Sequence, residues 1–99
     1  MDIKEWQQKF VHAIKNRFPN EWTKEQRLLA IYRQLADVSG AIAVSGGTLK
    51  CNLHGYENVD HAIACVFADL FMLAEQIDLE KELGEVLCWL ETVDKKAEN

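Results

Sequence analysis

The segment from residue 59 to residue 77 constrains the fold most, because it is apolar along nearly its whole length. Its larger apolar residues recur every three or four positions, which is the period of an α-helix: Val59, Ile63, Val66, Leu70, Leu73 and Ile77. The opposite side is also mostly small or apolar beyond His61, and a helix that is apolar nearly all round is buried. We therefore expect a helix from about Tyr56 to Gln76, packed against its own bundle on one face and against another subunit or helix on the other.

Apolar residues at the same spacing of three or four positions predict three further helices. No segment shows the alternation of apolar and polar residues that is typical of a strand. Pro19 ends the first helix by forcing Phe18 out of helical geometry. Thr23 and Gln26 have the spacing of a capping box and open the second helix, which the stretch 45–47 (Ser-Gly-Gly) ends. Asp78 is suited to cap the fourth.

The expected architecture is an all-α four-helix bundle forming a single domain over residues 1–93, followed by a polar tail at 94–99. A core built from 99 residues is marginal, and small domains often associate to bury more surface. A homo-oligomer is therefore expected. No apolar run reaches the roughly 18 residues of a membrane span, and the first residues lack an apolar signal region, so we expect no membrane partner and a cytoplasmic location.

Charge and cysteine content argue against a nucleic-acid-binding protein, a disulfide-rich protein and a zinc protein. The net charge is −5, which argues against nucleic acid as a partner because phosphate backbones require a basic face. An acidic protein can still bind phosphates through a bridging divalent cation. Three cysteines with wide spacings and no CxxC pair favour neither a disulfide framework nor a zinc site.

Two carboxylates precede the apolar run and suggest a metal site. Glu57 and Asp60 stand three residues apart, a spacing that makes side chains neighbours on a helix, and their oxygens suit Mg²⁺. Gln34 and Asp37 have the same spacing on the second helix and could face the third. Two alternatives remain: first-turn acids are favoured by the helix dipole alone, and the flanking histidines 54 and 61 could help to hold zinc or iron.

Several stretches resemble one known family. "ENVD" at 57–60, "VFADLFMLAEQIDLEKEL" at 66–83 and "IKEWQQKF" at 3–10 are similar to segments of the MazG-like, all-α nucleoside triphosphate pyrophosphohydrolases. That family carries EExxE followed by ExxD, forms dimers or tetramers, and uses magnesium to hydrolyse nucleotides to the monophosphate and pyrophosphate. The resemblance covers most of residues 3–90 and implies a bundle of MazG-like type.

The first motif departs from the family pattern. Arg33 and Gln34 stand where the paired glutamates belong, and only Asp37 keeps a carboxylate. The second motif also admits an ungapped alignment, in which Asp60 takes the glutamate position and Ile63 the aspartate position. Exchanging two carboxylates for an arginine and an amide weakens both metal binding and activation of water. The arginine could instead contact phosphate, because a guanidinium suits oxyanions.

The resemblance therefore implies Mg²⁺-dependent (or Mn²⁺-dependent) hydrolysis of (d)NTP to (d)NMP and pyrophosphate, with activity reduced or lost. It assigns Glu57 and Asp60 to catalysis and metal binding, Asp37 and Gln34 to the metal, and Arg33 to the substrate. The alternative is a catalytically inactive helical bundle that serves binding or assembly.

Overall fold

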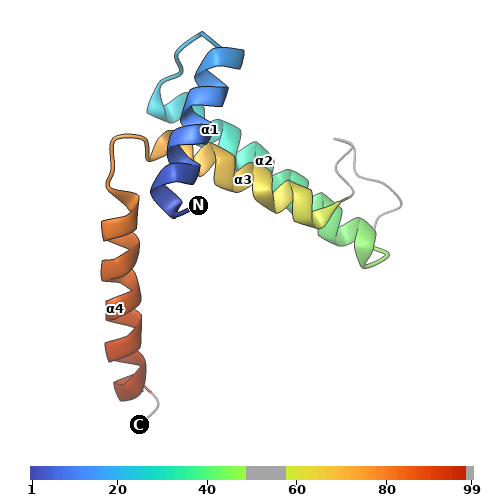
Figure 1. Cartoon of the computed structure of the whole chain (residues 1–99). Coiled ribbons are helices and arrows are strands. Elements are labelled where there is room, and N and C mark those ends of the chain that lie inside the picture. Colours follow the sequence, from blue (N-terminus) through green and yellow to red (C-terminus); the bar gives the residue numbers. More distant parts are fainter. Residues whose placement is uncertain (49–57, 98–99) are drawn as a thin grey trace.

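The computed structural model describes residues 1–48 and 58–97, with side chains through residue 92. Within these ranges it contains no strand and four helices: α1 (Ile3–Arg17), α2 (Lys24–Ser45), α3 (Val59–Leu73) and α4 (Leu79–Ala97) (Figure 1). The all-helical prediction is confirmed. None of the helices in the part described has the length and apolar character that would let it cross a membrane.

Every helix begins with a side chain that accepts a hydrogen bond from a backbone N–H of its first turn. These caps are Asp2, Thr23, Asn58 and Asp78. At α2 the predicted capping box is complete, because Thr23 Oγ1 accepts from Gln26 N at 3.2 Å and Gln26 Oε1 accepts from Thr23 N at 2.9 Å. Asp78 caps α4 as predicted, accepting from Lys81 N at 3.2 Å. Local chemistry thus sets where each helix begins.

Glycines stand just after the end of α2 and in the middle of α4, and only the first is required by the backbone. Helix α2 stops at Ser45 as predicted, and Gly47 follows with a φ of 79°, a backbone conformation that favours glycine. Gly84 lies inside α4, with open space where a side chain would stand. The first glycine serves a turn, whereas the second serves no close contact in a single chain.

Helix α3 is shorter than its apolar pattern suggests. It begins at Val59, behind the cap Asn58, and ends at Leu73 rather than at Gln76. The chain then turns, with Ile77 N donating to Ala74 O at 3.0 Å. This turn redirects the backbone before α4 starts.

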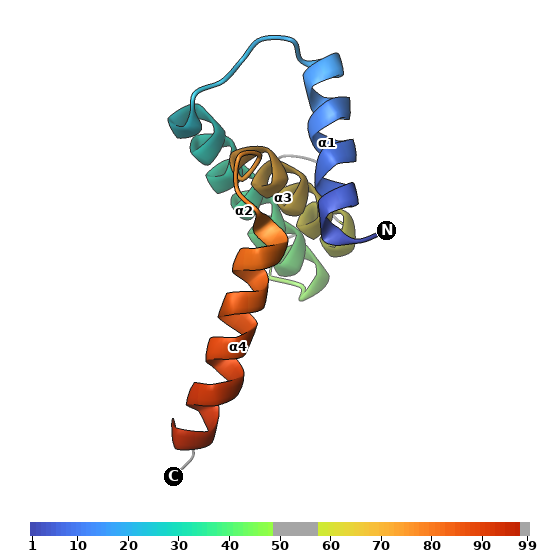
Figure 2. The ribbon, with the colours of Figure 1, turned by 60° about the vertical axis from the view of Figure 1, so that its left-hand side comes forward.

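Helices α2 and α3 form an antiparallel hairpin, and α1 packs across α3 (Figures 1 and 2). Helix α4 leaves the end of the hairpin and extends away from it (Figure 2). Among the helices described, α4 touches only α1. The bundle within one chain is therefore built from α1, α2 and α3.

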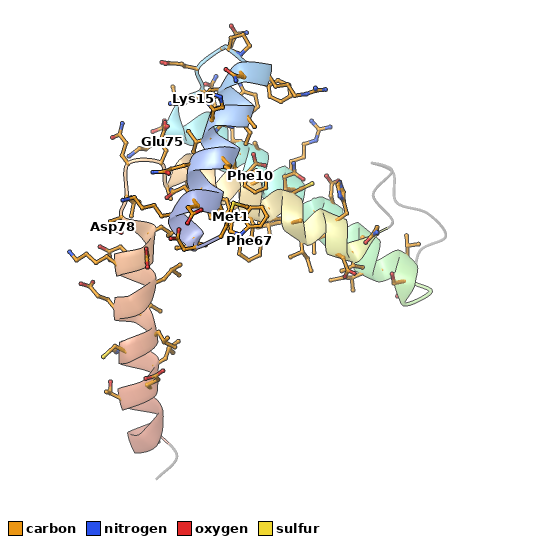
Figure 3. All side chains as sticks on the ribbon, viewed as in Figure 1. Met1, Phe10, Lys15, Phe67, Glu75 and Asp78 are labelled. Atoms are coloured by element: carbon orange, nitrogen blue, oxygen red, sulfur yellow. The ribbon has the colours of Figure 1, made fainter. Side chains whose placement is uncertain are left out.

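The core is small and centres on the hairpin. Its buried apolar residues are Ile31, Ala41, Ala62, Phe71 and Met72. Phe71 stacks against Phe10 of α1 with ring centroids 5.7 Å apart, and Phe10 stacks against Trp6 at 6.0 Å. The buried Gln7 ties α1 to the end of α3, where its Nε2 donates to Ala74 O at 2.8 Å and to Phe71 O at 3.3 Å. The ion pair of Lys15 Nζ with a Glu75 oxygen, 2.8 Å long, lies further along the same contact (Figure 3).

Many large apolar side chains stay exposed in a single chain. No helix described in the same chain covers the second face of α3, where Ile63, Phe67 and Leu70 are exposed, so the expected cover by another subunit stays a prediction. On α2, Leu28, Tyr32, Leu35 and Ile42 are exposed as well. The apolar surface of the hairpin therefore exceeds what α1 covers.

Candidate functional site

A cleft of about 410 Å³ opens between α1, α2 and α3, and it collects most of the polar residues predicted to be functional. Arg33, Gln34 and Asp37 all line it. The remaining lining residues come from the end of α1, the following connection, the start of α2 and the middle of α3: Ile14, Phe18, Asn20, Trp22, Arg27, Ala30 and Asp69. The structure thus brings three of the five predicted site residues to one place.

The lining side of α2 follows from helical spacing. Arg33 and Gln34 each lie three or four residues from both Ala30 and Asp37, so the four residues share a side of the helix. Asp37 points toward α3 and is only 4% exposed, whereas Gln34 is half-buried and Arg33 is exposed. The prediction that Gln34 and Asp37 face the third helix is confirmed in this respect.

Asp69 is a cleft residue that the motif comparison did not include. Burial raises the pKa of its carboxyl above the ordinary value, while the positive charge of Arg27 and a hydrogen bond from Gln34 act in the opposite direction. The negative charges of Asp69 and Asp37 also help burial to raise the pKa of the Cys65 thiol, so the two carboxylates act on one region between α2 and α3. In the sequence, the only sign that Asp69 belongs to a site is that it is an acid in an otherwise apolar stretch of helix. A charge buried in such a stretch needs partners.

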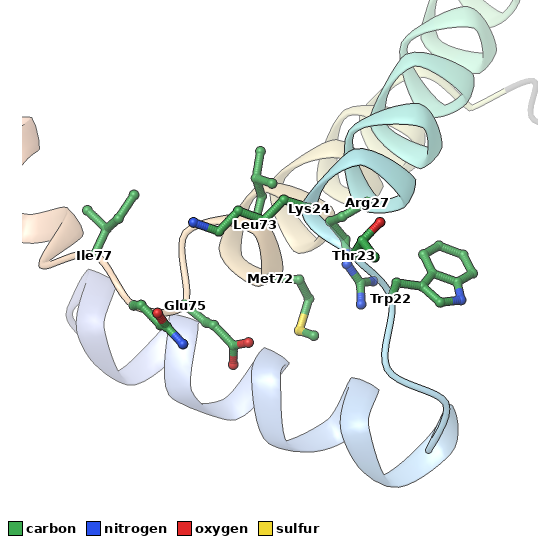
Figure 4. A pocket seen from close by; sticks show the side chains of 9 residues that line it. Trp22, Thr23, Lys24, Arg27, Met72, Leu73, Glu75 and Ile77 are labelled. Atoms are coloured by element: carbon green, nitrogen blue, oxygen red, sulfur yellow. The ribbon is translucent and has the colours of Figure 1, made fainter.

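Trp22 and Arg27 form the wall of the cleft near the start of α2. The guanidinium carbon of Arg27 lies 4.9 Å from the centroid of the Trp22 ring, within the range of a cation–π contact. Both residues also border a smaller hollow of about 90 Å³ between the start of α2 and the end of α3, where Met72 and Glu75 lie (Figure 4). An aromatic face and a cation therefore stand together at the cleft's edge.

Of the two acids predicted at the start of α3, Asp60 is described and does not line the cleft. Asp60 is exposed in the first turn of α3, and Glu57 lies outside the described residues, as does His54. Across residues 1–48 and 58–97, no three histidine, cysteine, aspartate or glutamate side chains are arranged to hold a metal. A metal ion in this cleft would therefore also need coordinating oxygen atoms from a bound small molecule.

No protein-family model, curated protein or solved structure matches the chain. The family resemblance of residues 3–90 therefore stays a prediction, as do the activity and the metal that it implies.

Replacing Asp69 with asparagine should stabilise the fold at neutral pH. The folded-state pKa of Asp69 lies above its ordinary value of 3.8, so the folded chain holds this proton more tightly than the unfolded chain. The contribution of this group to stability therefore falls as the pH rises from 3.8 through the folded-state pKa. Asp69→Asn removes that loss, and its urea midpoint should exceed the wild-type midpoint at about pH 7 and approach it at about pH 3.5.

Asp60→Asn provides the matched control, because Asp60 is an exposed acid on the same helix. Its urea midpoint should not rise above the wild-type midpoint at neutral pH, because an acid in the first turn of a helix is favoured by the helix dipole. An Asp69→Asn midpoint at neutral pH that is unchanged or lowered would contradict the unfavourable burial of the ionised carboxylate.

Proposed function

We propose that the cleft binds the phosphate chain of a nucleoside triphosphate and that the protein is a Mg²⁺-dependent or Mn²⁺-dependent pyrophosphohydrolase of reduced activity. One observation carries this proposal: two arginines, two carboxylates and an indole ring surround one cleft. The cleft's volume of about 410 Å³ lies within the range of small-molecule sites.

The arginines suit the anionic part of such a ligand. A guanidinium can donate two parallel hydrogen bonds to phosphate oxygens, and Arg33 is exposed at the cleft, where a ligand can reach it. Arg27 is held between the Trp22 ring and the charge of Asp69. The indole ring supplies an apolar face for the base.

The acidic side of the cleft suits a hard cation shared with the ligand. In nucleotide sites Mg²⁺ is usually bound through one or two carboxylates together with substrate phosphates, and it keeps several waters. Asp37 and Asp69 supply carboxylates, and Gln34 Oε1 is buried with no hydrogen-bond partner among the described residues, so it can accept from such a water. The family resemblance adds Glu57 and Asp60 as metal ligands. Because Asp60 does not line the cleft, these two would hold a separate ion rather than share the one at Asp37 and Asp69. The bound ion would neutralise charge on the phosphates during attack by water.

The proposed reaction assigns distinct tasks to the residues of the chain. Asp37 accepts the proton of the attacking water, because it is a carboxylate buried beside the cleft. Arg33 binds the departing pyrophosphate and balances its growing charge. Water oxygen joins the α-phosphorus as the bond to the bridging oxygen breaks, which gives a nucleoside monophosphate and pyrophosphate.

The assay measures pyrophosphate release from a panel of NTPs and dNTPs with Mg²⁺ or Mn²⁺. We expect slow release by the wild type, at least about tenfold slower release by Asp37→Asn and Glu57→Gln, and wild-type release by Glu25→Gln. Glu25 is the matched control, since it is an exposed acid on α2 away from the cleft lining. The absence of both pyrophosphate release and any thermal shift with metal or nucleotide would refute the proposal.

A second candidate function is a catalytically inactive module for binding or assembly. The extensive exposed apolar surface of α2, α3 and α4 favours it, and so does the arginine–glutamine pair in place of two acids. A nucleotide-dependent thermal shift without pyrophosphate release would identify a binding module. The absence of both effects would leave assembly as the candidate function.

A further inference from the structure

Helix α4 carries an apolar stripe that the described part of the chain leaves uncovered. Its members repeat every three or four residues and so lie on one side of the helix: Leu79, Leu83, Val86, Leu87 and Leu90. We call these five residues the α4 stripe. The last four are 41–56% exposed. Their side chains stand clear of the hairpin (Figure 3).

The contact of α4 with the rest of the chain is confined to its beginning. Among the helices described, α4 contacts only α1, and a hollow of about 280 Å³ lies between Lys4 and Gln7 of α1 and Leu79 and Glu80 of α4. Leu79 is half-buried there, whereas every residue from 80 to 92 is exposed. Beyond this contact α4 projects away from the other helices (Figure 2). The stripe is therefore open along most of its length.

Glutamates border the α4 stripe on both sides. At about 100° per residue, Glu80 and Glu91 lie roughly 80–100° to one side of the middle of the stripe, and Glu82 lies about 80° to the other side. Lys81 is the single basic residue between positions 79 and 92, and it lies on the opposite side of the helix. An apolar surface with two acidic edges thus selects what can cover it.

The acidic edges argue against three kinds of cover. Nucleic acid is repelled, because phosphates require a basic surface. Anionic lipid head groups attract helices whose polar side is basic, and α4 has the opposite charge. A second α4 would bring glutamates next to glutamates, and such contacts between like charges disfavour a wrong partner.

The other described helices of the chain do not supply the complementary surface. Helices α2 and α3 together carry four acids against three bases, so the hairpin has no basic edges to offer. Helix α1 carries four bases against one acid, but its rings Trp6 and Phe10 already belong to the stack on Phe71. A second copy of these helices would therefore match the α4 stripe poorly.

We propose that the α4 stripe docks an amphipathic helix of a different protein, whose own apolar stripe is bordered on both sides by lysine or arginine. The spacing of Leu79, Leu83, Val86 and Leu90 is that of the seam along which two helices pack side by side. Charges beside such a seam set the choice of partner. The docking goes beyond the proposed hydrolysis, and α4 does not line the cleft, so either proposal can fail without the other.

A designed peptide serves as the probe, and its binding to the full-length protein is measured by fluorescence anisotropy. The peptide is a helix of about 18 residues with leucines at the spacing of the α4 stripe and lysines along both edges. It should bind at least about tenfold more tightly than a peptide with glutamates along the edges, and its binding should weaken with salt. A third peptide has the composition of the first but leucines scattered around the helix. Equal binding of the first and third peptides would reflect only attraction to a chain of net charge −5 and would overturn the proposal.

Variants of α4 test the two features of the surface separately. Leu83→Gln should weaken binding of the lysine peptide at least about tenfold. Cys88→Gln is its matched control, because the exposed Cys88 lies on the side of α4 away from the stripe, and it should bind as the wild type does. Undiminished binding by Leu83→Gln would overturn the proposal, provided that circular dichroism shows the wild-type helix content.

The acidic edges are tested by a variant that combines Glu80→Gln, Glu82→Gln and Glu91→Gln. It should lose the preference for the lysine peptide over the glutamate peptide. Glu85→Gln should keep that preference, because Glu85 lies toward the opposite side of α4 from the stripe. A preference that survives the combined variant would contradict recognition by charge.

Hydrogen exchange of the full-length protein locates the docked peptide. Exchange of the α4 amides should slow when the lysine peptide is added and should be fast without it. Slow exchange of α4 in the protein alone, as a dimer by light scattering, would assign the stripe to a second copy and overturn the proposal. Equal slowing by vesicles of zwitterionic phosphatidylcholine would assign it to a lipid surface and overturn the proposal as well.

Discussion

Phe71→Ala should lower the free energy of unfolding by about 3–5 kcal/mol. Phe71 is 6% exposed, and its ring stacks on Phe10, which in turn stacks on Trp6. Truncation removes both the transfer of the ring from water and its contacts with α1. The cavity would lie where α1 crosses α3, and the surrounding core is too small to fill it.

The size of this effect is large relative to the whole protein. Domains are commonly stable by only about 5–15 kcal/mol, so the variant would approach unfolding at 37 °C. Urea titration at one fixed protein concentration, followed by far-UV circular dichroism, measures the change. Phe18→Ala is the control, because Phe18 is 62% exposed and its truncation should change stability by no more than about 0.5 kcal/mol. A loss below about 1 kcal/mol for Phe71→Ala would show that the ring is not part of the core.

Ala41→Leu should destabilise the fold by about 3 kcal/mol, at the upper end of the range for overpacking. Ala41 is completely buried, and α3 is the only described helix that α2 contacts. A larger side chain at this position must therefore push α2 and α3 apart. Separation of the two helices would also loosen the packing of Ile31 and widen the cleft around Asp37.

Ala36→Leu is the matched control for this substitution, since Ala36 is exposed on the same helix. Both substitutions add the same side chain, and leucine and alanine are both strong helix formers, so helix propensity contributes little to the difference. The urea midpoints of the two variants should therefore separate by the cost of overpacking alone. Equal midpoints would mean that α2 and α3 do not approach closely at Ala41.

Sequence patterns predicted the features of this fold that depend on neighbouring residues. The capping box at Thr23, the stop after Ser45 and the cap at Asp78 each involve atoms within a few residues, so their chemistry can be recognised in the sequence. The placement of Gln34 and Asp37 toward α3 could also be predicted, because both residues border the apolar stripe of their own helix.

Features that depend on the meeting of distant segments were not predicted. The direction of α4 is set by the turn between Ala74 and Ile77, which the apolar pattern of α3 concealed. An apolar stripe indicates which side of a helix avoids water, but it does not tell whether the same chain covers that side. For the same reason, the contribution of Asp69 and Arg27 to the cleft emerged only once the segments that carry them lay side by side.

The exposed glycine within α4 affects the helix–coil equilibrium of that segment. Gly84 costs about 1 kcal/mol of helix stability relative to alanine, and no contact of a single chain compensates for it. In proteins most of the stability of a helix comes from the packing of its apolar side rather than from helix propensity. Helix α4 is therefore the part of the described fold that should lose helicity at the lowest urea concentration, because its apolar side has few contacts to stabilise it.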